Sequence, residues 1–161
     1  MPRSRHGGLV IFISFLIAII LTILPLPTWA QVFRPEWITL VLIYWCMALP
    51  SRISLGWAWV AGLMLDVTLG NLLGLHALSL TIVAFLTIKL YQRIRVYPLA
   101  QQALAILVLV AMSQLLNLWI LGIIGKTPGS WTYWLPSISS AIFWPWLFVV
   151  MRGARRHFRV T

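Results

Sequence analysis

The sequence predicts an all-α integral membrane protein, a single bundle of about six transmembrane helices that occupies residues 1–161. Of these residues, 61% are hydrophobic and only 9% are charged, whereas soluble domains are nearer half apolar and a quarter charged. A soluble domain of this size could not bury so many apolar side chains. Six crossings of about 20 residues each would use about 120 residues and leave only short loops.

Six apolar stretches are the candidate spans. They cover residues 9–24, 35–49, 53–69, 72–90, 99–124 and 134–151. Helices are favoured over the strands of a membrane barrel, because the stretches lack polar alternation and are too long for such strands. The fold is therefore expected to be a helical bundle.

Prolines mark the ends of the first two stretches. Pro25 closes the first, and Pro50 closes the second. Pro35 suits the first helical position of the second stretch, because its missing N–H costs nothing there. Fifteen helical residues reach only about 22 Å, short of the hydrocarbon core of roughly 30 Å. A full crossing and a partly re-entrant helix both stay open for this stretch.

The remaining stretches are divided by glycine and proline. Gly70 and Asn71 separate the third from the fourth, so these two stretches are expected to form a tight hairpin. Pro98 opens the fifth stretch. Pro145 lies inside the sixth, where it removes a backbone donor and predicts a kink.

The distribution of positive charge orients the bundle. With a cytoplasmic N-terminus, ten basic residues fall on the inside and two on the outside, a strong positive-inside bias that also places the C-terminus in the cytoplasm. The outside pair is Arg34 and Lys126; the inside set is Arg3, Arg5, Arg52, Lys89, Arg93, Arg95, Arg152, Arg155, Arg156 and Arg159. The basic tail, Arg152 to Arg159, is expected to meet anionic lipid.

The chain contains only two acidic residues, Glu36 and Asp66. Glu36 lies in the segment Arg34-Pro35-Glu36-Trp37, where Arg34 and Glu36 are expected to form a surface ion pair of under about 1 kcal/mol. The alternative is that this segment contacts a partner protein.

Asp66 is the more informative acid, because a carboxylate at membrane depth is costly and usually faces other helices or a wet cavity. Gly62, Asp66, Gly70 and Gly74 recur every four residues, so in a continuous helix they would form a stripe that another backbone could approach closely. Asp66 is expected to hydrogen-bond the start of the next helix or to pair with His76. A structural role is favoured over a proton or ligand site.

Buried polar residues are also expected in the fifth stretch. Gln114 and Asn117 are three residues apart and therefore share one helix face. Hydrogen bonds between helices would explain them, and so would a substrate pocket.

Several function classes are disfavoured. The sequence lacks HExxH, GxSxG and a phosphate-binding glycine loop, so an enzyme is not expected. Two acids, three histidines and the single Cys46 are too few for a metal cage. The basic residues lie between apolar runs rather than on one basic face, so nucleic-acid binding is not expected either. No cofactor is expected.

Several motifs, taken in order along the chain, resemble the rod-shape-determining MreD family, in particular its gamma-proteobacterial branch. The resemblance is carried by residues 32–37, by Tyr44-Trp45 with residues 48–50, by Gly62, Asp66, Gly70 and Gly74, and by residues 144–148 with Met151-Arg152.

The resemblance implies a non-catalytic role in the bacterial cell-elongation complex of the inner membrane. MreD-like proteins are partners of the single-span protein MreC, and through it act with MreB filaments, the glycosyltransferase RodA and an elongation transpeptidase. Small-residue helix faces and the segment from Arg34 to Trp37 are the expected MreC contacts. The family also resembles the six-helix substrate-binding subunits of vitamin importers in fold.

Two other functions stay open. A small-molecule carrier or substrate-binding subunit would hold its ligand among the third to fifth stretches, near Asp66, His76 and Gln114. A structural membrane protein of another complex is the third possibility.

Overall fold

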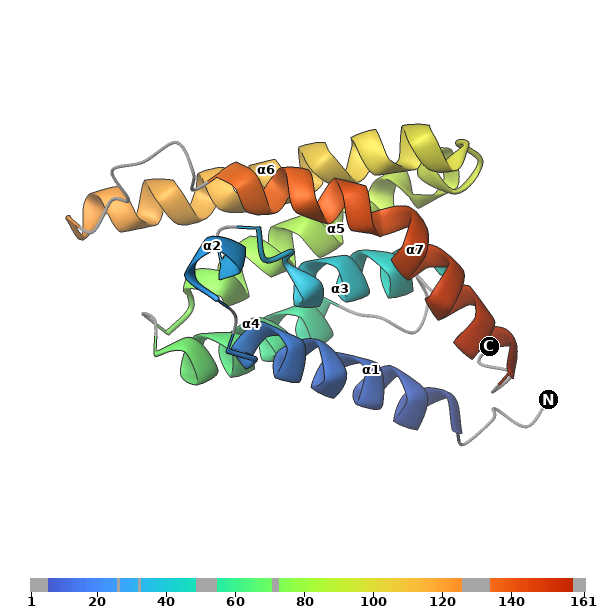
Figure 1. The fold of residues 1–161 in the computed structure, drawn as a ribbon, viewed down its shortest axis with the longest axis horizontal. Coiled ribbons are helices and arrows are strands. Elements are labelled where there is room, and N and C mark those ends of the chain that lie inside the picture. The colour runs from blue at the N-terminus through green and yellow to red at the C-terminus, as the bar shows by residue number, and fades with distance from the viewer. Residues whose placement is uncertain are drawn as a thin grey trace.

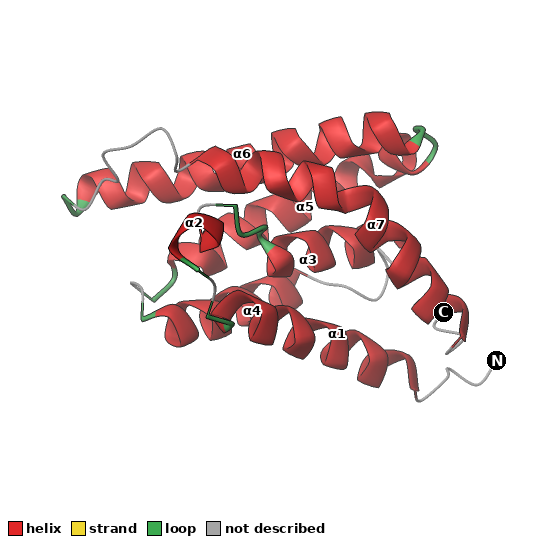
Figure 2. Ribbon diagram, viewed as in Figure 1, coloured by secondary structure: helices red, strands yellow, loops and turns green. Residues whose placement is uncertain are grey.

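The structure is a computed structural model that describes residues 6–25, 27–31, 33–48, 55–70, 73–125 and 134–157. Its elements are α1 (His6–Ile23), α2 (Thr28–Gln31), α3 (Trp37–Ala48), α4 (Leu55–Leu69), α5 (Leu75–Arg95), α6 (Leu99–Ile123) and α7 (Leu135–His157). The described residues form helices and loops and no strand (Figure 2). The predicted all-α class is therefore confirmed.

Three of the helices, α5, α6 and α7, are long and apolar enough to cross a membrane. Among the described residues, α1, α3 and α4 provide shorter apolar segments. Large apolar side chains are exposed on the outside of the bundle, including Ile142 at 70% and Trp119 at 67%. Lipid is the solvent that such a surface requires, so the chain is a membrane protein.

Successive long helices run in alternating directions, and α1 begins at the same end of the bundle where α7 finishes (Figure 1). We call this the basic end, because Arg95 of α5 and Arg152 and Arg155 of α7 lie there around one pocket. The opposite end, where Thr22, Pro35, His76 and Pro136 line another pocket, is called the outer end.

Helix α3 lies inside the bundle, in contact with α1, α5 and α7 (Figure 1). Every residue from Ile38 to Met47 is buried. The helix is about 18 Å long at the usual rise per residue, too short to cross a bilayer alone. Since protein surrounds it, its length does not have to match the thickness of the lipid. This explains why the second apolar stretch looks short in the sequence.

Helix α3 begins at Trp37, so the prediction that Pro35 occupies the first helical position was wrong. Leu40 N–H donates to the Glu36 carbonyl at 3.0 Å, and Trp37 N–H donates to the Pro35 carbonyl at 3.0 Å. Residues 35–37 therefore make a tight turn centred on Glu36 where the helix starts.

Aromatic side chains form the centre of the core. Tyr44 packs edge-on against Trp45 with ring centroids 5.3 Å apart, and against Phe148 at 5.7 Å. Trp45 Nε1 donates to Ser14 Oγ at 2.8 Å, which ties α3 to α1. Trp144 Nε1 donates to Gln102 Oε1 at 3.2 Å, which ties α7 to α6. Both buried indole N–H groups are thus hydrogen-bonded, as burial of a polar group requires.

Helix α7 continues through Pro145 and changes direction along its length (Figure 1). Some residues used to predict the orientation lie outside the described part of the chain: Arg3, Arg5, Arg52, Lys126 and Arg159. The cytoplasmic location of both chain ends therefore stays a prediction.

Candidate functional site

Asp66 closes the hairpin between α4 and α5 at the outer end. Its side chain is 0% exposed. Oδ2 accepts a hydrogen bond from Gly74 N–H at 3.0 Å, and Oδ1 accepts one from His76 N–H at 3.0 Å. Oδ1 also lies 2.7 Å from Nδ1 of the His76 ring. The structure therefore contains both contacts that the sequence left as alternatives.

These contacts give α5 its N-terminal cap. The N-cap residue, Gly74, has no side chain to cap the helix, and the first N–H groups of any helix lack partners within that helix. Asp66 of α4 supplies the missing acceptor, and its negative charge also suits the positive end of the helix dipole. The carboxylate oxygens of Asp66 thus find their hydrogen-bond partners within the same chain.

Gly62 brings α4 and α5 into backbone contact. A Cβ atom added at Gly62 would overlap the backbone of Ala77 and lie 2.7 Å from the His76 carbonyl carbon. The face of α4 that carries Gly62 is therefore packed against α5 of the same chain. The predicted stripe does not continue as a helix, because Gly70 and Gly74 have φ of 70° and 99° and form the turn.

Arg34 and Glu36 do not form the predicted surface ion pair. The Arg34 guanidinium donates to the carbonyls of Thr22 and Leu24, the latter at 2.6 Å. Carbonyls at the end of a helix lack partners within it and carry partial negative charge, so the end of α1 attracts this arginine. Glu36 instead accepts from Thr39 Oγ1 at 3.0 Å.

The segment that carries Arg34 and Glu36 is also tied to α7. Glu36 N–H donates to the buried hydroxyl of Ser140 at 3.0 Å. The Trp37 ring packs against Phe143, with centroids 5.6 Å apart. Ser140 was missed from the sequence, because it is one of three serines near the start of α7 and no local pattern distinguishes it from Ser137 and Ser139.

An outer pocket of about 210 Å³ lies where these segments meet. Arg34, Glu36 and Thr39 line it together with His76, whose ring is held by Asp66. Arg34 and His76, which the sequence treated separately, are thus brought to one place.

The buried polar residues of α6 form a different site. Gln114 Oε1 accepts from Ser137 Oγ of α7. Asn117 and Ser113 are buried nearby on α6, and neither Asn117 Oδ1 nor Ser113 Oγ has a hydrogen-bond partner among the described residues. Gln114 does not line the outer pocket, so this pocket does not gather the three residues named for a carrier site.

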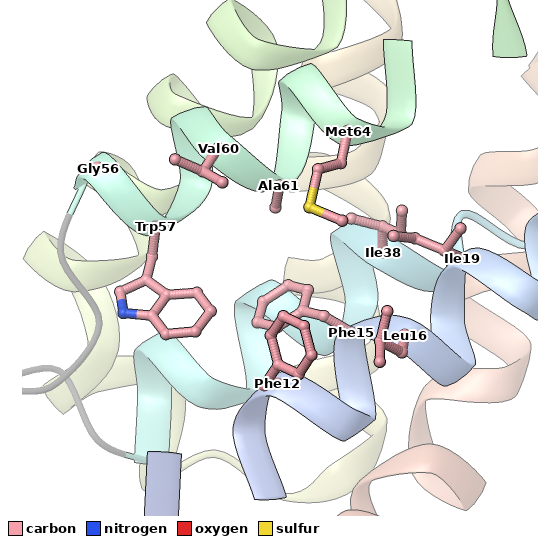
Figure 3. Close-up of a pocket in the computed structure, with 10 residues that line it drawn as sticks. All are labelled: Phe12, Phe15, Leu16, Ile19, Ile38, Gly56, Trp57, Val60, Ala61 and Met64. Carbon is pink, nitrogen blue, oxygen red and sulfur yellow. The ribbon is translucent and has the colours of Figure 1, made fainter. Parts of the chain in front are cut away.

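A lateral groove separates α1 from α4 (Figure 3). Its volume is about 460 Å³. Phe15 of α1 stacks on Trp57 of α4 at one side, with centroids 5.9 Å apart. The residues that line the groove are Phe12, Phe15, Leu16, Ile19, Ile38, Gly56, Trp57, Val60, Ala61 and Met64. The sequence did not indicate this groove, since its apolar residues resemble a lipid-facing surface.

Within the described residues, no three histidine, cysteine or acidic side chains come together in a way that could hold a metal ion. The groups at the outer end make hydrogen bonds to one another, to helix ends and to neighbouring segments. The arrangement described here positions backbone segments, and the groove offers an apolar contact surface.

Comparison with known proteins agrees with the resemblance. Residues 3–154 match the family model described as rod shape-determining protein MreD. The chain is 35% identical to the rod shape-determining protein MreD of Haemophilus influenzae over 142 residues, which cover 88% of each chain. No solved structure matches significantly, so the likeness to vitamin-importer subunits stays a prediction.

Proposed function

The chain belongs to the MreD family of rod shape-determining proteins, and from this premise we propose that it helps to maintain rod shape as a multi-pass component of the bacterial inner membrane. In this proposal it has no catalytic step. It binds MreC, and through MreC it couples MreB filaments, RodA and the elongation transpeptidase to peptidoglycan synthesis.

The lateral groove is the observation that supports a helical partner. Helices associate in lipid by close packing, because lipid tails are as apolar as the side chains they would replace. The groove between α1 and α4 is such a concave site, and a second apolar groove, of about 410 Å³, lies between α1 and α7. A single transmembrane helix, such as that of MreC, could place its side chains in the lateral groove between α1 and α4.

The groove also leads to the segment from Arg34 to Trp37. Ile38 lines both the groove and the outer pocket, so a helix in the groove would meet this segment at the outer end of the bundle. Arg34 and Glu36 are engaged within the chain. We propose that they hold the segment in place for MreC rather than bind MreC through their charges.

A small-molecule carrier receives less support. The pocket beside His76 measures about 210 Å³, below the range of about 300–1,000 Å³ usual for ligand sites. The groove is large enough, but it is apolar and opens sideways. A polar ligand would find few partners there.

Affinity purification of the tagged protein from native membranes, followed by mass spectrometry, tests the proposal. We expect MreC to be recovered together with elongation enzymes. Val60→Trp fills the groove, whereas Val108→Trp adds the same bulk on the outside of α6. Val60 and Val108 are matched in exposure, at 53% and 56%.

We expect Val60→Trp to reduce MreC recovery at least about tenfold, which corresponds to about 1.4 kcal/mol of binding free energy, and Val108→Trp to leave it unchanged. If both variants retain MreC, the groove is not its docking site. A preparation that carries a small molecule or an ATPase in place of MreC would favour the carrier.

A further inference from the structure

Three arginines from two helices converge at the basic end. Arg95 of α5 and Arg152 and Arg155 of α7 line a pocket of about 380 Å³. Its remaining lining residues are Tyr44, Met47, Ala48 and Phe148. The pocket lies at the far end of α3 from the outer pocket, so it is distinct from the sites described above.

No acidic side chain is available to neutralise these arginines. The full sequence contains two acids, Glu36 and Asp66. Glu36 precedes α3, whose length of about 18 Å separates it from the basic pocket. Asp66 is paired with His76 at the outer end. Like charges held together without a counter-charge repel one another, so the pocket is suited to an anion from outside the chain.

Arg95 is already positioned by the backbone. One of its amino groups donates to the carbonyl of Met47 at 2.5 Å and lies 3.4 Å from that of Ala48. These carbonyls belong to the last turn of α3, so Arg95 caps that helix. Arg152 and Arg155 have no ion-pair partner among the described residues. Their guanidinium groups remain available, and guanidinium groups bind phosphate oxygens in bidentate geometry.

The rest of the pocket indicates what kind of anion fits. Met47, Ala48 and Phe148 provide an apolar part beside the arginines. The arginines lie in or beside the last turns of their helices, the level at which lipid phosphates meet a transmembrane bundle. A free phosphate ion would leave the apolar part empty, whereas a phospholipid would place its glycerol and first methylene groups there.

We propose that this pocket is a specific binding site for the headgroup phosphate of one anionic phospholipid. Arg152 and Arg155 bind the phosphate, Arg95 holds the pocket open by capping α3, and the apolar residues contact the glycerol end of the lipid. This is a discrete site, in contrast to the diffuse attraction that any basic segment exerts on an anionic membrane. It does not depend on the proposed binding of MreC.

Native mass spectrometry of the purified full-length protein in detergent, titrated with dioleoylphosphatidylglycerol, tests the site. We expect one retained lipid per chain and much weaker retention of dioleoylphosphatidylcholine. Arg152→Gln with Arg155→Gln is expected to weaken binding of the anionic lipid by about tenfold or more. The control is Lys89→Gln with Arg93→Gln, which removes the same charge from exposed positions of α5 that do not line the pocket.

A second variant keeps every charge. Ala48→Leu adds bulk to the apolar part of the pocket and is expected to weaken lipid binding as well. Equal losses from both double variants, with no effect of Ala48→Leu, would show diffuse attraction and overturn the site. Displacement of the bound lipid by millimolar inorganic phosphate would assign the pocket to a free anion and overturn the lipid assignment. Thermal unfolding of each variant in detergent shows whether the fold is intact, and lost binding counts only for variants whose unfolding midpoint is unchanged.

Discussion

The two ends of the bundle treat charge in opposite ways. At the outer end, Asp66 is buried against two backbone N–H groups and His76, and Arg34 donates to the carbonyls that end α1. At the basic end, Arg152 and Arg155 surround a pocket without an acid. Polar groups at the outer end hold helices together, whereas at the basic end Arg95 does so and Arg152 and Arg155 have no ion-pair partner among the described residues.

This difference separates residues needed for folding from residues needed for binding. Removing a buried group that satisfies other groups costs stability, because the partners left behind stay buried and unpaired. Removing an exposed charge changes stability little. Substitutions at the two ends should therefore differ in thermal unfolding, and the following predictions run from the largest expected effect to the smallest.

Gly62→Leu should be the most damaging change. The new side chain would overlap the backbone at Ala77, so α4 and α5 would have to separate, at a cost of about 3 kcal/mol or more. The measurement is the midpoint of thermal unfolding in detergent. Gly8→Leu is the control, because nothing lies within 4 Å of a Cβ at that position. Equal midpoints for the two variants would show that the close contact is absent.

Asp66→Ala should destabilise the fold by about 2 kcal/mol, because it leaves the partly buried N–H groups of Gly74 and His76 without an acceptor. Asp66→Asn keeps one acceptor oxygen and should cost less. The same unfolding assay ranks the two variants, and MreC recovery with cell shape reports function. An unchanged unfolding midpoint for Asp66→Ala would show that Asp66 does not stabilise α5 as its cap. Survival of both rod shape and MreC recovery in Asp66→Asn would show that the negative charge is not required.

Gly74→Ala should cost about 1 kcal/mol, because Gly74 has φ of 99°, a conformation that strains residues with a Cβ atom. Space is not the reason, since nothing lies within 4 Å of the added atom. Gly153→Ala, also in open space but without a positive φ, should have no such cost. A stability loss in Gly153→Ala equal to that in Gly74→Ala would contradict this explanation.

Arg152→Gln with Arg155→Gln should change the free energy of unfolding by less than about 0.5 kcal/mol in lipid-free detergent. Addition of anionic lipid should then stabilise the unsubstituted protein more than the variant, because a ligand that binds only the folded state raises its stability. If the unfolding midpoint of this variant in lipid-free detergent is as low as that of Asp66→Ala, the two ends of the bundle do not differ in their contribution to stability.

Sequence patterns sufficed for the helical class and for the hairpin around Gly70, because hydropathy and turn-forming residues act locally. They failed for Arg34 and Glu36. Arg34 and Glu36 were expected to pair with each other. Arg34 instead binds the end of α1, which the fold brings close, and Glu36 binds the hydroxyl of Thr39 in the first turn of α3.

The sequence also did not indicate which residues from distant parts of the chain would come together in the fold. Arg95 and Arg152 are separated by α6 in the chain, and each alone resembles an ordinary positive-inside residue. The groove between α1 and α4 was missed for a related reason. Phe12 and Val60 would suit a lipid-facing surface equally well, and only the packing of α1 against α4 makes the surface between them concave.

The burial of α3 has a consequence for biogenesis. Ribosomes synthesise α3 before α5 and α7, the helices that enclose it together with α1, and Arg95, which caps its end, follows Met47 by 48 residues. A helix of about 18 Å cannot rest stably across a bilayer on its own. Helix α3 should therefore wait, held by the insertion machinery or lying at the membrane surface, until the later helices arrive. Correct insertion of α3 would thus depend on completion of the late part of the chain.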